Sequence, residues 1–182
     1  MTTKIGIYYG SQTGTTDGIA KLIAQQFQAS GFATNTECVS RITPEQLTTC
    51  DVLLLGTSTW DIGELPYDWQ KWWSNFDQLD LTGKSVALFG LGDQFGYPDT
   101  FCDAMRYLYD KVIERGGTIT GYWPVDGYTF DASTAVFDGY FVGLAIDEVN
   151  QSDLTVERIE AWCNQLIGVL SLDSQYSGVA TA

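Results

Sequence analysis

The sequence predicts an α/β fold, in which a parallel β-sheet is covered by helices on both of its faces. Uninterrupted apolar runs, typical of strands buried on both sides, alternate along the chain with segments whose apolar residues recur at helical spacing. Three of these runs close on a glycine, which favours a turn directly after the strand. The chain has 182 residues, of which 45% are hydrophobic, and this is enough apolar material for the core of one domain.

Five strand segments are expected, the last of them interrupted. The stretch 124–139 carries the turn signals Asp126-Gly127 and Asp138-Gly139 between two strand-like runs, which favours an insertion into a strand over a separate domain. The predicted strand segments are Ile5–Tyr9, Val52–Leu55, Val86–Phe89, Thr118–Trp123 and Tyr140–Ile146.

Helices are expected between these strands and after the last one. The tryptophans and phenylalanine of the second helix share one face, which predicts core packing for them. We expect one domain over residues 1–170 and a small, polar tail over residues 171–182. The predicted helices begin near Ile19, Trp69, Met105 and Leu154; the third stops at Gly116-Gly117 and the last ends near Leu170.

The composition excludes one class of partner. There are 9 basic and 23 acidic residues, so the formal net charge is −14, and histidine is absent. Nucleic-acid binding needs a basic footprint, which this chain does not offer. A histidine base or a histidine metal ligand is excluded as well. The negative charge can steer a basic partner protein, or it can serve solubility alone.

The sequence predicts a cytoplasmic protein with reduced thiols and no membrane insertion. The apolar runs are too short to cross a bilayer, and MTTKIGIYYG lacks the pattern of a signal peptide. The cysteines show no metal-ligand or dithiol spacing, so we expect free and mostly buried thiols. They are Cys38, Cys50, Cys102 and Cys163.

The loop after the first predicted strand is typical of a phosphate site. It combines hydroxyl residues and glycine at the start of a helix, where backbone N–H groups and the helix dipole favour an anion. An ordinary N-cap needs only one of these hydroxyls. A triphosphatase loop is excluded because Thr15, not lysine, follows Gly14, and the GxGxxG fingerprint is absent. We therefore predict a monophosphate site at Ser11, Gln12, Thr13, Gly14, Thr15 and Thr16.

Large aromatic residues occupy the loops after the next two strands. Trp60 follows the strand that closes at Gly56, and Tyr97 follows the one that closes at Gly90. Ligands of such folds bind outside the carboxyl ends of the strands, so the two rings are predicted to clamp a planar heteroaromatic ring. The alternative is that each ring packs on the protein's own surface. A phosphate site beside a flat-ring site fits FMN.

Several sequence blocks resemble the long-chain flavodoxins of bacteria and cyanobacteria, and together they span the chain from Lys4 to about Leu170. The stretch 124–139 matches the strand insertion of the long-chain members. The resemblance implies a flavodoxin-like three-layer α/β/α fold, with a five-stranded parallel sheet in the order 2-1-3-4-5. The blocks are YYGSQTGTT, TSTWDIGELPYDW, GKSVALFGLGDQFGYPD, GYWPVDGY, FVGLAIDEVNQSDLT and RIEAW.

The resemblance also implies which residues contact FMN. Tyr97 would stack on one flavin face and the Trp60 loop on the other, while Ser11 to Thr16 would hold the phosphate. Some relatives carry an acidic residue where this chain has Val149, so Val149 is left out of the predicted site. The ribityl loop is Ser58, Thr59, Trp60 and Asp61, continued by Ile62 and Gly63, and the pyrimidine-edge loop is Leu91, Gly92 and Asp93.

By the same resemblance the protein is a low-potential one-electron carrier rather than an enzyme. It would use the semiquinone/hydroquinone couple of non-covalently bound FMN and substitute for ferredoxin. The implied partners are a flavodoxin/ferredoxin–NADP reductase, a photosystem in phototrophs and other low-potential redox enzymes, and a monomer is expected. Acidic residues near the flavin edge would orient a basic partner; they are Asp61, Glu64, Asp68 and Asp93.

Two other functions remain as alternatives. An FMN-dependent quinone reductase on the same fold would need its own nicotinamide and substrate pocket, for which the flavin loops offer no candidate acid, base or cation. A nucleotide-binding module without redox chemistry would bind no flavin. A signalling receiver domain is excluded, because Gly10 and Gly56 occupy the places where it requires acidic residues.

Overall fold

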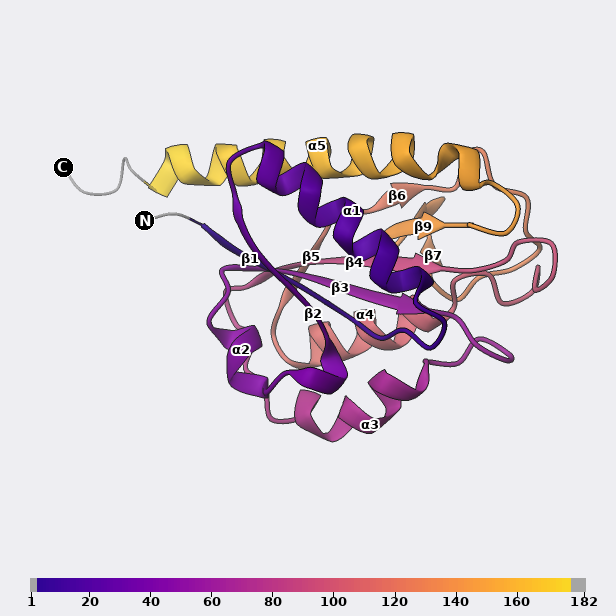
Figure 1. Ribbon diagram of the computed structural model, residues 1–182, viewed down its shortest axis with the longest axis horizontal. Coiled ribbons are helices and arrows are strands. Elements are labelled where there is room, and N and C mark those ends of the chain that lie inside the picture. Colours follow the sequence, from indigo (N-terminus) through magenta and orange to yellow (C-terminus); the bar gives the residue numbers. More distant parts are fainter. Residues whose placement is uncertain (1–2, 178–182) are drawn as a thin grey trace.

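The computed structural model describes residues 3–177, with side chains to residue 170, and it forms three layers. Figure 1 shows a central sheet with α1 and α5 on one face and α2, α3 and α4 on the other. The helices are α1 (Thr15–Ala29), α2 (Pro44–Thr48), α3 (Tyr67–Phe76), α4 (Ala104–Glu114) and α5 (Thr155–Ser177), with single-turn helices η1 (Val39–Arg41) and η2 (Ser152–Leu154).

The sheet is parallel, and its strand order confirms the prediction. Its strands follow the order β2-β1-β3-β4-β5, and β9 also pairs with β4. The pairings of β1 with β3 and of β3 with β4 are both parallel and in register. The strands of this sheet are β1 (Lys4–Tyr9), β2 (Ala33–Cys38), β3 (Val52–Ser58), β4 (Ser85–Leu91), β5 (Thr118–Thr120) and β9 (Leu144–Ile146).

Side chains of the central strands alternate between two cores, one on each face of the sheet. In β3, for example, Leu53 and Leu55 pack under α3 and α4, whereas Leu54 packs under α1 and α5. Helix α3 buries Trp69 and Trp72 on the first of these faces, which confirms their predicted core role. Because both faces are buried, the strands tolerate no polar alternation, and this explains why they read as continuous apolar runs.

The last strand is split by an insertion, as predicted. β5 pairs with the first half of β4, at Ser85–Ala87, and β9 pairs with the second half, at Phe89–Leu91. Between them lies a small antiparallel sheet in the order β6-β8-β7. The extra strands are β6 (Trp123–Pro124), β7 (Val136–Phe137) and β8 (Tyr140–Phe141). The two long runs predicted at residues 118–123 and 140–146 are therefore each broken in two.

Three elements differ from the sequence-based expectation, and one of them is the short helix α2, which was not predicted. The edge strand β2 was missed, because its sequence ATNTEC is polar and only partly buried, so it lacks the apolar run of an interior strand. Helix α5 continues to Ser177, beyond the end expected near Leu170. Of the predicted tail, residues 178–182 lie outside the described residues.

Two further expectations concern the membrane and the thiols. No helix within residues 3–177 is long and apolar enough to span a membrane. All four cysteines are free and buried, as predicted. For Cys163, burial alone raises the pKa of the thiol to about 12, so it stays protonated and unreactive at neutral pH.

Gly143 provides a test of how closely the split strand approaches β4. A Cβ atom at this position would lie 2.1 Å from the backbone oxygen of Leu88, which cannot move without breaking the sheet. We expect Gly143→Ala to lower the free energy of unfolding by about 1–3 kcal/mol. Urea unfolding followed by tryptophan fluorescence measures this change.

Gly168→Ala is the matched control for that variant. Gly168 lies in α5, and a Cβ atom added there would meet no other atom within 4 Å, so the same substitution should stabilise the protein by about 0.5–1 kcal/mol. Equal stability of the two variants would contradict the close approach of β9 to β4.

Candidate functional site

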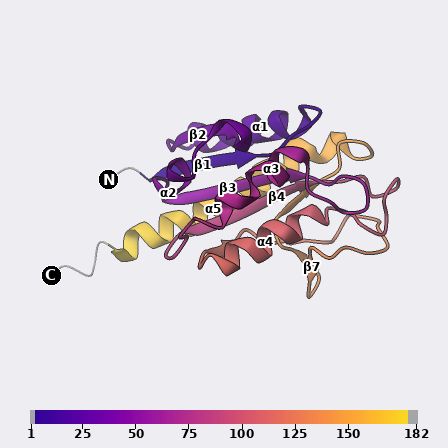
Figure 2. The same ribbon diagram turned by 90° about the horizontal axis from the view of Figure 1, so that it is seen from below.

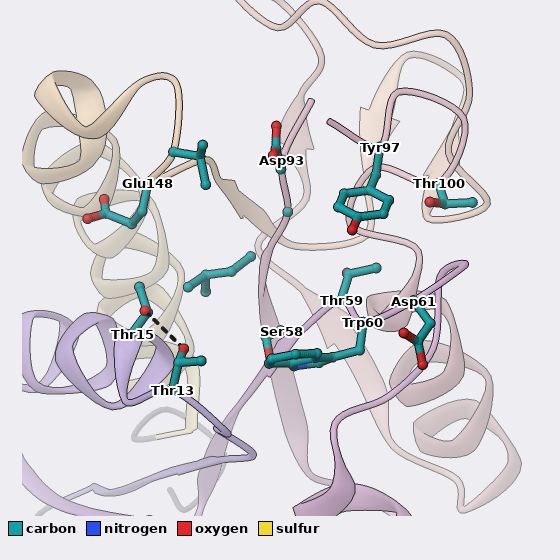
Figure 3. Close-up of a pocket in the computed structure, with 13 residues that line it drawn as sticks. Thr13, Thr15, Ser58, Thr59, Trp60, Asp61, Asp93, Tyr97, Thr100 and Glu148 are labelled. Carbon is teal, nitrogen blue, oxygen red and sulfur yellow. Dashed lines mark hydrogen bonds between the residues drawn. The ribbon is translucent and has the colours of Figure 1, made fainter. Parts of the chain in front are cut away.

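A cleft of about 500 Å³ opens where the central parallel strands end. This volume lies in the usual range of small-molecule sites, and the place is where ligands of doubly wound sheets bind. Figure 3 shows Thr13 and Thr15 at one end of the cleft and Trp60, Asp61 and Tyr97 at the other. The lining residues are Thr13, Thr15, Ser58, Thr59, Trp60, Asp61, Leu91, Gly92, Asp93, Tyr97, Thr100, Glu148 and Val149.

The first loop brings the start of α1 to the cleft. Gly14 is the N-cap residue, with a φ of 87° that glycine adopts at low cost, and no side chain caps the helix. The backbone N–H of Gly14 donates to Ser11 Oγ at 3.1 Å, which closes the loop on itself. The hydroxyl oxygens of Thr13 and Thr15 lie 3.3 Å apart and face the cleft. The uncapped end of the helix is thus suited to an anion.

The other members of the predicted phosphate loop lie away from this cleft. Thr16 lies in the first turn of α1 and is buried, and Gln12 is exposed. Ser11 and Gly14 instead line a second, polar pocket of about 490 Å³, together with residues such as Asp17 and Asp68. Of the predicted loop, only Thr13 and Thr15 line the cleft with their own atoms.

The second loop holds the tryptophan in a fixed orientation. The indole Nε1–H of Trp60 donates to Ser58 Oγ at 2.8 Å. Trp60 and Glu64 exchange two backbone hydrogen bonds, of 2.9 and 2.7 Å, so residues 61–63 form a tight reversal of the chain. The reversal needs positive φ values at Asp61 (43°) and Gly63 (86°).

This reversal also explains why two predicted residues do not line the cleft. Ile62 stands at its tip and is 85% exposed, while Gly63 is buried against the side chain of Asp103. Ser58, Thr59, Trp60 and Asp61 line the cleft, as they must if this loop contacts a ligand.

The third loop is organised by Asp93. One of its carboxylate oxygens accepts hydrogen bonds from the backbone N–H groups of Phe95 (3.1 Å) and Gly96 (2.7 Å). The backbone N–H of Tyr97 donates to the carbonyl of Asp93 at 2.9 Å, which positions the half-exposed tyrosine ring over the cleft. The N–H donor of Gly96 leads the causes that lower the pKa of Asp93, so its carboxylate is ionised at neutral pH.

Sequence reasoning missed three residues of the cleft: Thr100, Glu148 and Val149. Val149 is left out of the predicted site because some relatives carry an acidic residue there, but it lines the cleft and is 70% exposed. No local sequence pattern marks Glu148 and Val149: they reach the cleft because the carboxyl end of β9 lies beside that of β4, where the Gly92 N–H donates to Ile146 O at 3.0 Å. The loop after β9 therefore belongs to the same edge of the sheet.

Asp68 has a different role from the one expected of an acidic surface residue. It lies in the first turn of α3, where its Oδ2 accepts hydrogen bonds from the backbone N–H of Ser11 (3.1 Å) and from the Cys38 thiol (3.2 Å). The carboxylate is turned towards the back of the first loop and lines the second pocket rather than the cleft. Asp68 is therefore not placed to orient a partner at the cleft.

The chemistry of the cleft is polar at one end and aromatic at the other. Threonine hydroxyls and the uncapped N-terminus of α1 can hold an anion, while Trp60 and Tyr97 can flank a flat ring. No residue that lines the cleft, within the part of the chain that the structure describes, is basic. An anionic group would thus be bound by N–H and O–H donors, and these residues fit FMN.

The fold and the cleft together define a doubly wound α/β protein with a site for a flat ring and an anionic tail at the carboxyl edge of its sheet. The flavodoxin family model matches residues 7–162. The chain is 46% identical to a flavodoxin of Nostoc sp. over 91% of its own length and 96% of that protein. It is 44% identical to flavodoxin 1 of Escherichia coli, over 92% and 95% of the two chains.

Solved structures agree with this result. The flavodoxin of Fusobacterium nucleatum bound to flavin mononucleotide superposes with a TM-score of 0.85 at 35% identity, covering 91% of this chain and 97% of that one. The chain therefore belongs to the flavodoxin family, whose members are electron-transfer proteins rather than enzymes.

The depressed pKa of Asp93 predicts an acid-dependent loosening of the third loop. A carboxyl whose folded-state pKa is lowered contributes stability above its unfolded pKa, which is about 4, and loses that contribution as the pH falls through the folded value. We expect Asp93→Ala to be less stable than the wild type near pH 6, and the difference to shrink below about pH 4. Urea unfolding at a series of pH values measures it, and a pH-independent difference would contradict the assignment.

Proposed function

We propose that this protein is a low-potential one-electron carrier that holds one FMN non-covalently in the cleft. The observation that carries the proposal is the polarity of the cleft, with Thr13 and Thr15 at one end and Trp60 and Tyr97 at the other. That polarity matches the phosphate and the isoalloxazine ring of FMN. The F. nucleatum flavodoxin, which binds flavin mononucleotide, supports the choice of this ligand.

The residues of the cleft would divide the work of binding. The uncapped amides of α1 and the hydroxyls of Thr13 and Thr15 would hold the phosphate, and Trp60 would stack in the orientation set by Ser58. Tyr97 would cover the ring from the third loop. When bound, FMN supplies reversible one-electron chemistry.

The charge of the lining residues supports a low potential. Asp61, Asp93 and Glu148 line the cleft, and no basic residue in the described part of its lining offsets them. Each added electron makes the flavin more negative, so this surrounding opposes the last reduction step and lowers its potential. A carrier of this kind can take the place of ferredoxin between redox proteins.

Stepwise anaerobic reduction of the purified, flavin-loaded protein tests the function. We expect a yellow protein that turns blue after the first electron and bleaches after the second, with the second step at a strongly negative potential. Direct bleaching together with NADPH oxidation in the absence of a reductase would instead indicate the FMN-dependent quinone reductase. A colourless protein that takes up no added FMN would contradict the proposal altogether.

The rim of the cleft suggests how a partner docks. Ile62, Phe95 and Val149 are 85%, 64% and 70% exposed, and the exposed carboxylates of Asp61 and Glu64 stand among them. An apolar rim with acidic neighbours suits a basic protein with an apolar contact area. The proposed partners are a flavodoxin/ferredoxin–NADP reductase, a photosystem or another low-potential redox enzyme. The carrier itself is proposed to be monomeric and cytoplasmic.

Electrostatic docking predicts a dependence on salt. Above the low-salt range, electron transfer to a basic reductase should slow as ionic strength rises, because the long-range attraction is screened. Glu64→Gln should reduce the rate and flatten the salt profile. Glu160→Gln removes the same charge from an exposed position of α5 and serves as the control. Stopped-flow kinetics provide the measurement, and a flat profile for the wild type would rule out steering.

A further inference from the structure

Asp147 is a fully buried carboxylate directly behind the cleft. It follows β9 and has no exposed surface. Its Oδ2 accepts hydrogen bonds from the backbone N–H of Gln94 at 3.1 Å and from the Gln94 side-chain amide at 2.8 Å. Its Oδ1 accepts from the backbone N–H groups of Val149 (3.1 Å) and Asn150 (3.0 Å). The Asn150 side-chain amide lies 3.1 and 2.9 Å from the two oxygens.

Every one of these partners is an N–H donor. In a protonated carboxyl, the O–H would face one of these N–H groups, and two donors cannot form a hydrogen bond with each other. The arrangement therefore matches the ionised form. No salt bridge of the described residues includes Asp147. The buried cation on α5, Arg158, instead stacks on the ring of Tyr128, with 4.0 Å between guanidinium carbon and ring centroid. The charge of Asp147 is therefore held by amide dipoles alone.

The donors belong to two different walls of the cleft. Gln94 lies in the third loop, between the cleft residues Asp93 and Tyr97, whereas Asn150 follows the cleft residues Glu148 and Val149. The Asn150 side chain also bridges the walls directly, because it donates to Asp93 Oδ1 at 2.8 Å.

The same cluster reaches the strand insertion. Gln94 is fully buried, and its side-chain oxygen accepts a hydrogen bond from the backbone N–H of Thr129. Gln94 thus connects Asp147 to the insertion on one side, while Asn150 connects it to the rim on the other.

We propose that Asp147 is a positioning residue whose hydrogen bonds hold the third loop to the loop after β9, and that its unpaired negative charge lowers the affinity of the cleft for reduced flavin. This inference rests on the proposed function, since it assigns to Asp147 an effect on FMN. Asp147 touches no part of the cleft surface itself and acts through the residues on either side. Loss of the hydrogen bonds to Asp147 would let Asp93 and Tyr97 move relative to Glu148 and Val149.

The test compares Asp147→Asn with Asp153→Asn in the full chain. Asp153 is an exposed carboxylate of η2, so its substitution removes the same formal charge without touching the cluster. Titration of the apo-protein with FMN should show binding weakened about tenfold or more in Asp147→Asn, because bonds to a charged acceptor are lost, and unchanged binding in the control. Wild-type affinity in Asp147→Asn would overturn the proposal.

The midpoint potential distinguishes the charge from mere loosening. A looser site weakens the binding of oxidised and reduced flavin alike, whereas loss of a negative charge favours the reduced form. We expect the potential of the second step to become less negative in Asp147→Asn, by more than in Asp153→Asn. An equal potential in the two variants would overturn the electrostatic part of the proposal.

Two further measurements keep the proposal testable if Asp147→Asn does not fold. Asn150→Ala removes the side-chain bridge to Asp147 and Asp93 at a partly exposed position, and it should weaken FMN binding as well. Amide hydrogen exchange of the apo-protein should be faster at Gln94 and Val149 in either variant. This exchange is measured without flavin, so it tests the hydrogen bonds of Asp147 even if the wild type binds no FMN, a result that would contradict only the proposed function. Unchanged exchange in the variants would overturn the positioning role of Asp147.

Discussion

The in-register pairing of β3 with β4 is the constraint on which the cleft depends. Ser58 lies opposite Leu91, so the two strands end at the same level, and the Thr59 N–H donates to Leu91 O at 3.0 Å just beyond the pairing. The loops that carry Trp60 and Tyr97 therefore leave the sheet side by side. A slip of one residue would turn every apolar side chain of a strand to the opposite face, and because both faces are buried under helices, as Figures 1 and 2 show, the register is strongly specified.

A rigid edge of the sheet does not by itself order the loops, and here short polar contacts do so. Each loop contains a side chain that binds its own backbone or a neighbouring side chain: Ser11 binds Gly14, Ser58 holds the Trp60 indole, and Asp93 closes the turn before Tyr97. Such contacts replace the hydrogen bonds that an irregular segment would otherwise make to water. Asp147 adds a contact between loops, and the insertion is tied to it through Gln94.

The accuracy of the sequence-based predictions differs between parts of the protein. Interior strands such as β3 and β4 were found because burial on both faces requires an unbroken apolar run. The edge strand β2 was missed because one paired neighbour and partial burial leave its sequence polar. At the site, Trp60 and Tyr97 stood out as large aromatic residues in loops, and the structure places both at the cleft. Glu148 and Val149 carried no such mark, since only the position of β9 beside β4 brings them there.

The sequence by itself determined the layered α/β architecture, the split last strand and the three loops that lead into the cleft, because local periodicity and turn residues encode these features. Only the tertiary structure decided which residues of those loops face the cleft. It buried Thr16 in the first turn of α1, placed Ile62 at the tip of a reversal and turned Asp68 towards the backbone of Ser11. The physical reason is that the direction of a loop side chain depends on hydrogen bonds to residues far along the chain, as between Asp68 and Ser11 or between Asp147 and Gln94, and no local pattern records such partners.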